Sequence, residues 1–226
     1  MKAGEGEVTT RQVFEKALAG VQSDILRMGA LAERMVHDAV AALMNQDAGL
    51  AAQVIAGDEQ VDQFFRRIED QCIALIATQH PVARDLRVVI TGIEILINLE
   101  RMSDYAVDIA QATMCISGSC LTGKAVAQIP RMGELAQRML KEGLDAYVQG
   151  DADKARAMCA LDDQVDYIFD YVHGQLTAAM QEDPGFINAG VQLAHVIRYL
   201  ERIADHATNV GEAVVYLITG ERRELN

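Results

Sequence analysis

The chain has 226 residues, half of them hydrophobic and 23% of them charged, which is enough apolar material for a buried core. Its formal net charge of −13 opposes binding to phosphate backbones or anionic lipid headgroups, and no run of basic residues counters it. Nucleic acid is therefore excluded as a partner.

The sequence carries no sign of secretion or membrane insertion. Its first residues lack the apolar core of a secretory signal. The most apolar segment, residues 88–100, is interrupted by Thr91, Gly92 and Glu94 and is too short to cross a bilayer. We expect a cytoplasmic protein, with its four cysteines reduced and used in packing.

Aromatic residues make up only 5% of the sequence and tryptophan is absent, whereas the helix-favouring residues Ala, Leu, Met, Gln and Glu are abundant. We therefore predict an all-α fold. Asp47 and Asp151 each suit a helix N-cap, and Pro81, Pro130 and Pro184 each suit the first turn of a helix. The predicted helices, in chain order, are 10–46, 48–79, 82–117, 125–149, 151–181 and 185–220, with residues 117–124 as a linker.

An internal repeat divides the chain into two halves. Shifting the sequence by 104 residues places 27–66 on 131–170 with 17 identities in 40 positions, and a shift of 101 places 99–112 on 200–213 with 6 in 14. Short connections make consecutive helices antiparallel. We therefore predict two antiparallel three-helix bundles related by pseudo-twofold symmetry, with domains at 10–118 and 124–220.

Pairs of acidic residues four apart recur at equivalent places in the second and third helices of each half. Residues at this spacing lie about 40° apart around a helix, so each pair shares one face. The first acidic set comprises Asp58, Asp62, Glu100, Asp104 and Asp108, and the second acidic set comprises Asp162, Asp166, Glu201, Asp205 and Asn209, where Asn209 stands in place of an acid.

The pairs of each half are expected to meet. Asp62 lies roughly 17 residues before the turn between the second and third helices and Glu100 roughly 18 after it, which places them level at ~1.5 Å per residue. Like charges one turn apart destabilise a helix by roughly 0.2–0.5 kcal/mol per pair. Salt bridges to Arg66, Arg67, Arg101 or Arg202 could offset this repulsion.

A bound cation would offset the repulsion more strongly, since clustered carboxylates suit hard multivalent ions. We expect divalent or trivalent metal ions, with iron, zinc, magnesium and manganese all open. The sequence contains no Glu-x-x-His pair of the di-iron type, and only His206, beside Asp205, is placed to join a metal site. No phosphate-binding loop or nucleophile motif indicates an enzyme.

A duplicated three-helix unit with acidic pairs on its second and third helices resembles the PhoU family of bacterial phosphate-signalling regulators. The likeness runs from about Phe14 to Thr219 and includes PVARDLRVV at residues 81–89, although the second half reads PGFINAGVQL there. It implies that the Glu/Asp-x-x-x-Asp pairs of both acidic sets bind metal.

The resemblance also implies a homodimeric, non-enzymatic adaptor that links an ABC phosphate transporter to a sensor histidine kinase. Such a protein would repress the phosphate-starvation response when phosphate is plentiful. Two alternatives stay open from the residues alone. One is a carboxylate-bridged metalloenzyme or metal store, and the other is a metal-free scaffold whose acids meet basic partner surfaces.

Overall fold

The structure is a computed structural model that describes residues 4–116, 123, 125–222 and 224–225, with side chains from residue 11 onward. Within these residues the protein is all-α, as predicted, and contains no strand. The elements are α1 (Gly4–Asn45), α2 (Ala48–Gln79), α3 (Arg84–Cys115), η1 (Val126–Gln128), α4 (Ile129–Gln149), α5 (Ala152–Cys159), α6 (Asp162–Glu182), η2 (Pro184–Phe186) and α7 (Ile187–Thr219), where η denotes a 3-10 helix.

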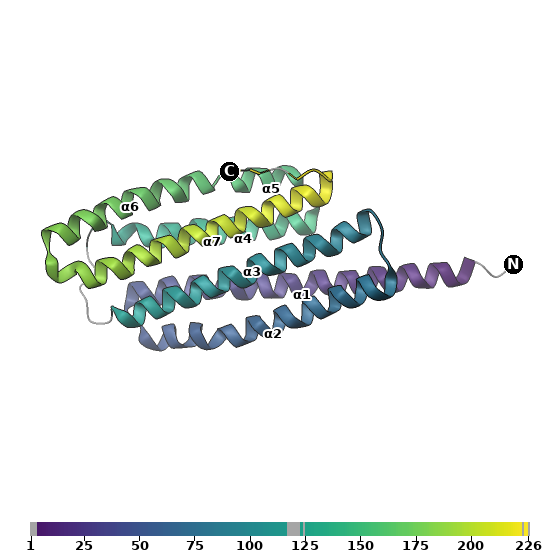
Figure 1. The fold of residues 1–226 in the computed structure, drawn as a ribbon, viewed down its shortest axis with the longest axis horizontal. Coiled ribbons are helices and arrows are strands. Elements are labelled where there is room, and N and C mark those ends of the chain that lie inside the picture. Colours follow the sequence, from purple (N-terminus) through teal and green to yellow (C-terminus); the bar gives the residue numbers. More distant parts are fainter. Residues whose placement is uncertain (1–3, 117–122, 124, 223, 226) are drawn as a thin grey trace.

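The two halves form adjoining bundles, α1 to α3 and α4 to α7 (Figure 1). Helices α3 and α7 pack against each other where the bundles meet, and α1 packs against α4. The α1–α4 crossing shows the predicted pseudo-twofold symmetry. Gly29 of α1 lies against Leu144 of α4, and Gly133 of α4, the counterpart of Gly29, lies against Val40 of α1. The two helices can approach closely at both points because glycine has no side chain.

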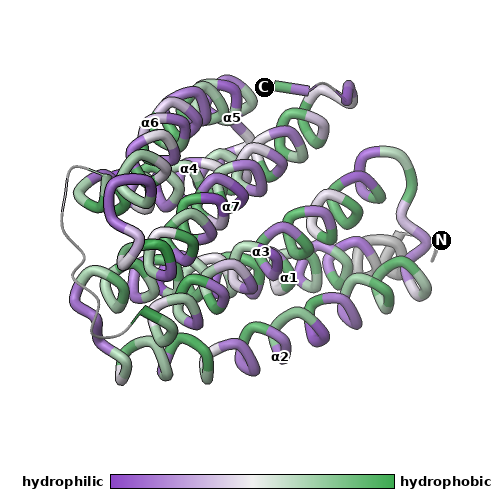
Figure 2. The backbone as a smooth tube through the Cα atoms, turned by 60° about the vertical axis from the view of Figure 1, so that its left-hand side comes forward, coloured by the Kyte–Doolittle hydropathy of each residue, from purple (hydrophilic) through white to green (hydrophobic). Residues whose placement is uncertain are grey.

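One continuous core joins the two halves. Buried apolar residues of all seven α-helices belong to a single cluster, to which the central helices α3 and α7 contribute long buried stripes. Polar and apolar residues alternate along the helices (Figure 2), as expected for helices with one buried face. In the described part of the chain, no helix has both the length and the apolar character needed to span a bilayer.

The predicted N-caps are confirmed. Asp47 accepts a hydrogen bond of 3.0 Å from the Leu50 N–H, and Asp151 accepts bonds from Asp153 and Lys154, each also 3.0 Å. Each cap satisfies backbone donors that the helix itself leaves unpaired.

Two of the three prolines lie where they were predicted. Pro130 lies in the first turn of α4 and Pro184 in that of η2. The expectation for Pro81 was wrong, because α3 begins only at Arg84. Pro81 instead follows His80, the left-handed C-cap of α2, at a position where proline ends a helix because it cannot continue one.

The predicted helix at 151–181 is also wrong, since it is divided into α5 and α6 at Ala160 and Leu161. The division accompanies a close approach of α5 to α7, which is possible because Gly211 of α7 has no side chain. A Cβ at Gly211 would come within 2.7 Å of both Cys159 Sγ and Met158 Cε. The first half has Ala110 at the equivalent place, and its helix α2 continues without a break.

The remaining predicted helices differ from the observed ones mainly at their ends. Helix α1 begins at Gly4 instead of residue 10, and a 3-10 turn, η1, precedes α4. The predicted linker at 117–124 and Cys120 lie outside the described residues, apart from Gly123. The described cysteines are free thiols: Cys72 and Cys159 are buried, as expected for packing residues, whereas Cys115 is exposed and the expectation was wrong for it.

Candidate functional site

The first acidic set lies on the packed pair α2 and α3. Helix α2 carries Asp58 and Asp62, and α3 carries Glu100, Asp104 and Asp108. These side chains are neither fully exposed nor enclosed, since Glu100 is 24% exposed and Asp62 43%. The set therefore occupies the rim of the helix pair, where carboxylates lose part of their water.

The acids of the first set act on one another across the two helices. Burial, and then the charges of Asp104 and Asp62, raise the pKa of Asp58. Burial, then Asp104, and more weakly Asp62 and Asp58, raise the pKa of Glu100, against the opposing effect of Arg101. These carboxylates share one electrostatic neighbourhood. Burial also raises the pKa of Asp104, to which Asp108 contributes as well.

Three members of the second acidic set have a similar arrangement on α6 and α7. Burial, followed by Asp205, raises the pKa of both Asp166 and Glu201. The fourth acid, Asp162, is buried at the first residue of α6. Its charge also affects Cys159. The pKa of that thiol is raised to about 12, mainly by burial and then by the charges of Glu212 and Asp162.

Arginines pair with the acids symmetrically. Arg101 and Arg202, equivalent in the repeat, lie 3.1 Å from Asp104 and Asp205. Arg66 lies 2.6 Å from Asp62. These three salt bridges match the sequence-based expectation, but Arg67 pairs with a different acid, Asp24, at 3.5 Å. Exposed ion pairs of this kind contribute only about 0–1 kcal/mol, so they offset the desolvation of the acids incompletely.

The donor atoms fit a hard cation in chemistry. Glu201 Oε2 is buried and accepts no hydrogen bond, although Arg202 Nε lies 3.7 Å away. Such an oxygen is a ligand that divalent ions take readily. As the side chains stand, no three His, Cys, Asp or Glu residues among those described are gathered into a group that could hold a metal. Metal binding therefore stays a prediction.

Sequence reasoning missed the aromatic and amide contacts that join α3 to α7 beside the acids. Tyr105 stacks on Tyr199 with ring centroids 5.8 Å apart, and its ring lies 5.8 Å from that of His206. The repeat could have revealed this contact. The 101-residue shift places Tyr105 on His206, so the two residues at the symmetry axis face each other.

His206 is engaged across this seam. Its Nδ1 lies 2.8 Å from Asn98 Oδ1, which also accepts a 3.2 Å bond from Asn209 Nδ2. Because Oδ1 can only accept, Nδ1 carries the proton. Burial lowers the pKa of His206, against the opposing effect of Asp205. Asn209 of the second acidic set is thus part of the contact between the halves.

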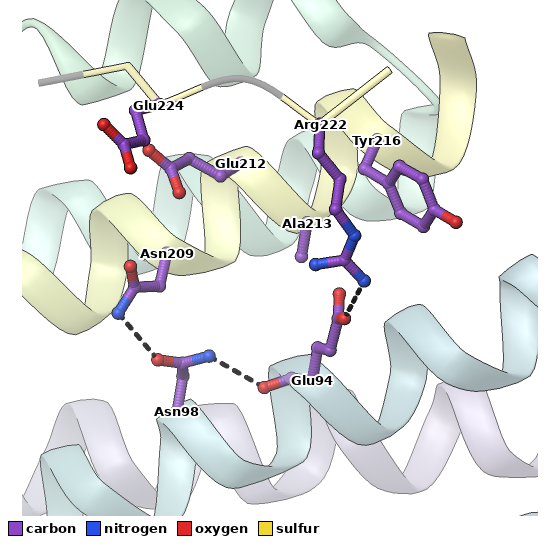
Figure 3. Close-up of a pocket in the computed structure, with 8 residues that line it drawn as sticks. All are labelled: Glu94, Asn98, Asn209, Glu212, Ala213, Tyr216, Arg222 and Glu224. Carbon is purple, nitrogen blue, oxygen red and sulfur yellow. Dashed lines mark hydrogen bonds and ion pairs between the residues drawn. The ribbon is translucent and has the colours of Figure 1, made fainter. Parts of the chain in front are cut away.

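A polar pocket of about 410 Å³ continues the seam (Figure 3). The C-terminal residues fold back over it, so that Arg222 pairs with Glu94 of α3 at 2.5 Å and lies 4.5 Å from the Tyr216 ring. The Leu225 N–H donates to Glu212 at 2.8 Å. The tail therefore contacts both central helices and occupies part of the groove between them.

Known proteins match both halves. The family model described as PhoU domain matches residues 25–113 and 129–214. A Clostridium acetobutylicum protein, named phosphate-specific transport system accessory protein PhoU homolog, is 41% identical over 218 residues, covering 96% of this chain and 99% of its own. A homolog of the same name from Pseudomonas aeruginosa is 36% identical over 209 residues, covering 92% and 86%.

Two crystal structures share the fold. PhoU from Pseudomonas aeruginosa superposes with a TM-score of 0.88 at 36% identity, covering 92% of this chain and 100% of that one. The phosphate transport system regulatory protein PhoU from Streptococcus pneumoniae gives 0.86 at 31% identity, covering 93% and 99%. The likeness therefore extends over almost the entire length of all three chains.

Proposed function

Because this chain belongs to the PhoU family, we propose that it is a negative regulator of phosphate uptake and of the phosphate-starvation response. It acts as a cytoplasmic adaptor between an ABC phosphate transporter and a sensor histidine kinase. The observation that carries this proposal is the match of both repeats to relatives named as accessory or regulatory proteins of phosphate transport. Those names support a role exercised through partners and not through catalysis.

Metal ions belong to the proposal as structural cofactors of the adaptor. Asp58, Asp62, Glu100 and Asp104 would hold one site, and Asp166, Glu201 and Asp205 the other, with Asp162 at its margin. A cation supplies positive charge that offsets the repulsion between acids on neighbouring helices. This chain's own contribution is to carry the carboxylates on two packed helices and to pair three of them with arginines.

Gene deletion in the host tests the regulator. We expect a phosphate-starvation reporter to become active in phosphate-rich medium, and the wild-type gene supplied in trans to restore repression. Normal repression in the deletion strain would overturn the proposal. A strain that lacks the histidine kinase as well should stay repressed, because the adaptor acts upstream of the kinase.

Metal analysis of protein purified without an affinity tag tests the sites. The variant Glu100→Gln with Asp104→Asn should lose the metal of the first acidic set. Glu134→Gln with Asp145→Asn, two acids on α4 outside both sets, should retain the wild-type metal content. Equal metal content in the two double variants would show that the first acidic set is not a metal site.

A further inference from the structure

Arginines without an acidic partner are rare in the described part of the chain, and two of the three lie close together. Most of its arginines form an ion pair with a carboxylate, whereas Arg34, Arg84 and Arg87 form none. Arg84 and Arg87 both lie at the start of α3. Two unpaired cations three residues apart are unexpected in a protein with a net charge of −13.

The two arginines differ in what surrounds them. Arg87 is partly buried, its Nε has no hydrogen-bond partner, and its Nη1 lies against Gly220, the C-cap of α7. A cation beside the last carbonyls of a helix is stabilised by the helix dipole, which accounts for Arg87. Arg84 is exposed and has no such explanation.

Arg84 stands at the edge of a pocket of about 270 Å³, which we call the Arg84 pocket. Helix α3 of the first half supplies one wall, and the ends of α4 and α7 of the second half supply the others. Apart from Arg84 its side chains are mostly apolar, and they include Val88, Tyr147, Val148, Leu217 and Ile218.

Part of this apolar lining faces solvent, since Val148 is 51% exposed and Ile218 41%. Val82, two residues before Arg84, is 73% exposed. Between them Ala83 has φ 49° and ψ −112°, a backbone conformation that L-residues avoid. An apolar surface with an unpaired cation at its edge thus lies at the junction of the two halves, next to a strained backbone corner at Ala83.

We propose that the Arg84 pocket docks a segment of a partner protein that presents a carboxylate next to an aliphatic side chain. The aliphatic group covers Val148, Ile218 and their neighbours, and the carboxylate pairs with Arg84. The proposal rests on the proposed function only in requiring that the chain acts through a protein partner. Because the pocket is built from both halves, an occupant also holds the two halves in their present relation.

Charge decides between this occupant and others. The net charge of −13 makes most of the surface repel an acidic segment. An exposed, unpaired arginine therefore marks a place where such a segment can bind. An anionic membrane gains only about 1 kcal/mol per basic residue near its surface, and this pocket offers a single exposed arginine where a membrane-binding segment carries several. A free inorganic anion makes no use of an apolar lining.

Photo-crosslinking in the host tests the proposal with the full chain. A benzophenone amino acid at position 148 should form an adduct with one protein, and the crosslinked peptide should contain both an acid and aliphatic residues. Arg84→Glu should reduce the adduct about tenfold, as expected when one member of an interfacial charge pair is reversed. Arg34→Glu makes the same change at an exposed, unpaired arginine on α1 and should leave the adduct unchanged.

Ile218→Glu is a second test of the same surface and should also remove the adduct, because it places a like charge beside the incoming carboxylate. Wild-type melting temperatures for both variants would separate lost docking from lost folding. The absence of an adduct, an adduct with lipid or with a second copy of this chain, or one that Arg84→Glu leaves intact would overturn the proposal. The identity of the crosslinked protein tests the regulator role separately. A protein outside phosphate transport and signalling would contradict that role but would still support the docking site.

Discussion

At the scale of single residues, the acidic sets place negative charge where packing partly excludes water. Burial is the largest cause of the raised pKa of Asp58, Glu100 and Asp104, and neighbouring acids add to it. In the metal-free protein each charge therefore opposes folding. Apolar residues at these positions would not carry this energetic cost. Acidic residues at positions where their charge destabilises the fold are typical of a binding site.

The raised pKa of Glu100 gives its stability effect a definite sign. Above the raised folded-state pKa, ionised Glu100 destabilises the fold, and this penalty disappears as pH falls below the ordinary value of 4.5. With chelator present, Glu100→Gln should melt about 1–2 °C above wild type at pH 7, from repulsion of roughly 0.2–0.5 kcal/mol per pair. The difference should vanish near pH 4.

Calorimetry of both proteins across this pH range gives the measurement. His206, whose pKa is lowered by burial, makes an opposite contribution, losing stability as pH falls through its ordinary value of 6.5. Because His206 is present in both proteins, its contribution cancels in the difference. A wild-type protein more stable than Glu100→Gln at pH 7 would contradict the assigned repulsion.

Backbone strain at Ala83 leads to a second prediction at this scale. A non-glycine residue at φ 49° costs about 1–3 kcal/mol, whereas glycine accepts this conformation at a smaller entropic cost. Ala83→Gly should therefore raise the melting temperature by about 2–4 °C. Ala74→Gly, the same change at an exposed interior position of α2, should lower it by a similar amount. A fall in both variants would show that Ala83 is not strained.

At the scale of elements, the two halves use the same helices differently. Helix α2 is continuous, but its counterpart is divided so that α5 can pack closely on α7 and α6 can continue toward η2. The division begins directly before Asp162, which is buried, whereas its repeat counterpart Asp58 is only partly buried. The second acidic set is therefore not a copy of the first, despite the matching sequence pattern.

The close approach of α5 to α7 can be tested at Gly211. Gly211→Ala would bring a Cβ within 2.7 Å of Cys159 Sγ and 3.3 Å of the Ala155 carbonyl oxygen, and overpacking of this kind costs about 1–3 kcal/mol. Gly174→Ala on α6, where no atom lies within 4 Å, should instead stabilise by up to about 1 kcal/mol. Urea unfolding measures both. Equal stabilisation by the two changes would mean that α5 does not restrict α7.

At the scale of the whole molecule, the repeat predicted the architecture because duplicated sequences with the same apolar spacing have the same helix path. Caps such as Asp47 were predictable, since they depend on a few neighbouring residues. The break at Ala160 was not, because it accompanies a contact between α5 and Gly211, which lies some fifty residues away. The acids of the candidate site were proposed from their spacing and from the family resemblance, and their role in metal binding stays a prediction. The role of Asn98 between the halves required knowing which helices meet.

The continuous core leads to a last prediction, that the two halves unfold as one unit. Ile68 on α2 is fully buried within the first half, and its replacement by alanine should cost about 2–5 kcal/mol. Since α3 and α7 share one core, α6 in the other half should lose protection at the same lower urea concentration as α2. Hydrogen exchange measured peptide by peptide along the urea series compares the two helices directly. If α6 kept its wild-type midpoint while α2 opened, the halves would be separate folding units, and the contact between α3 and α7 would be an interface between domains.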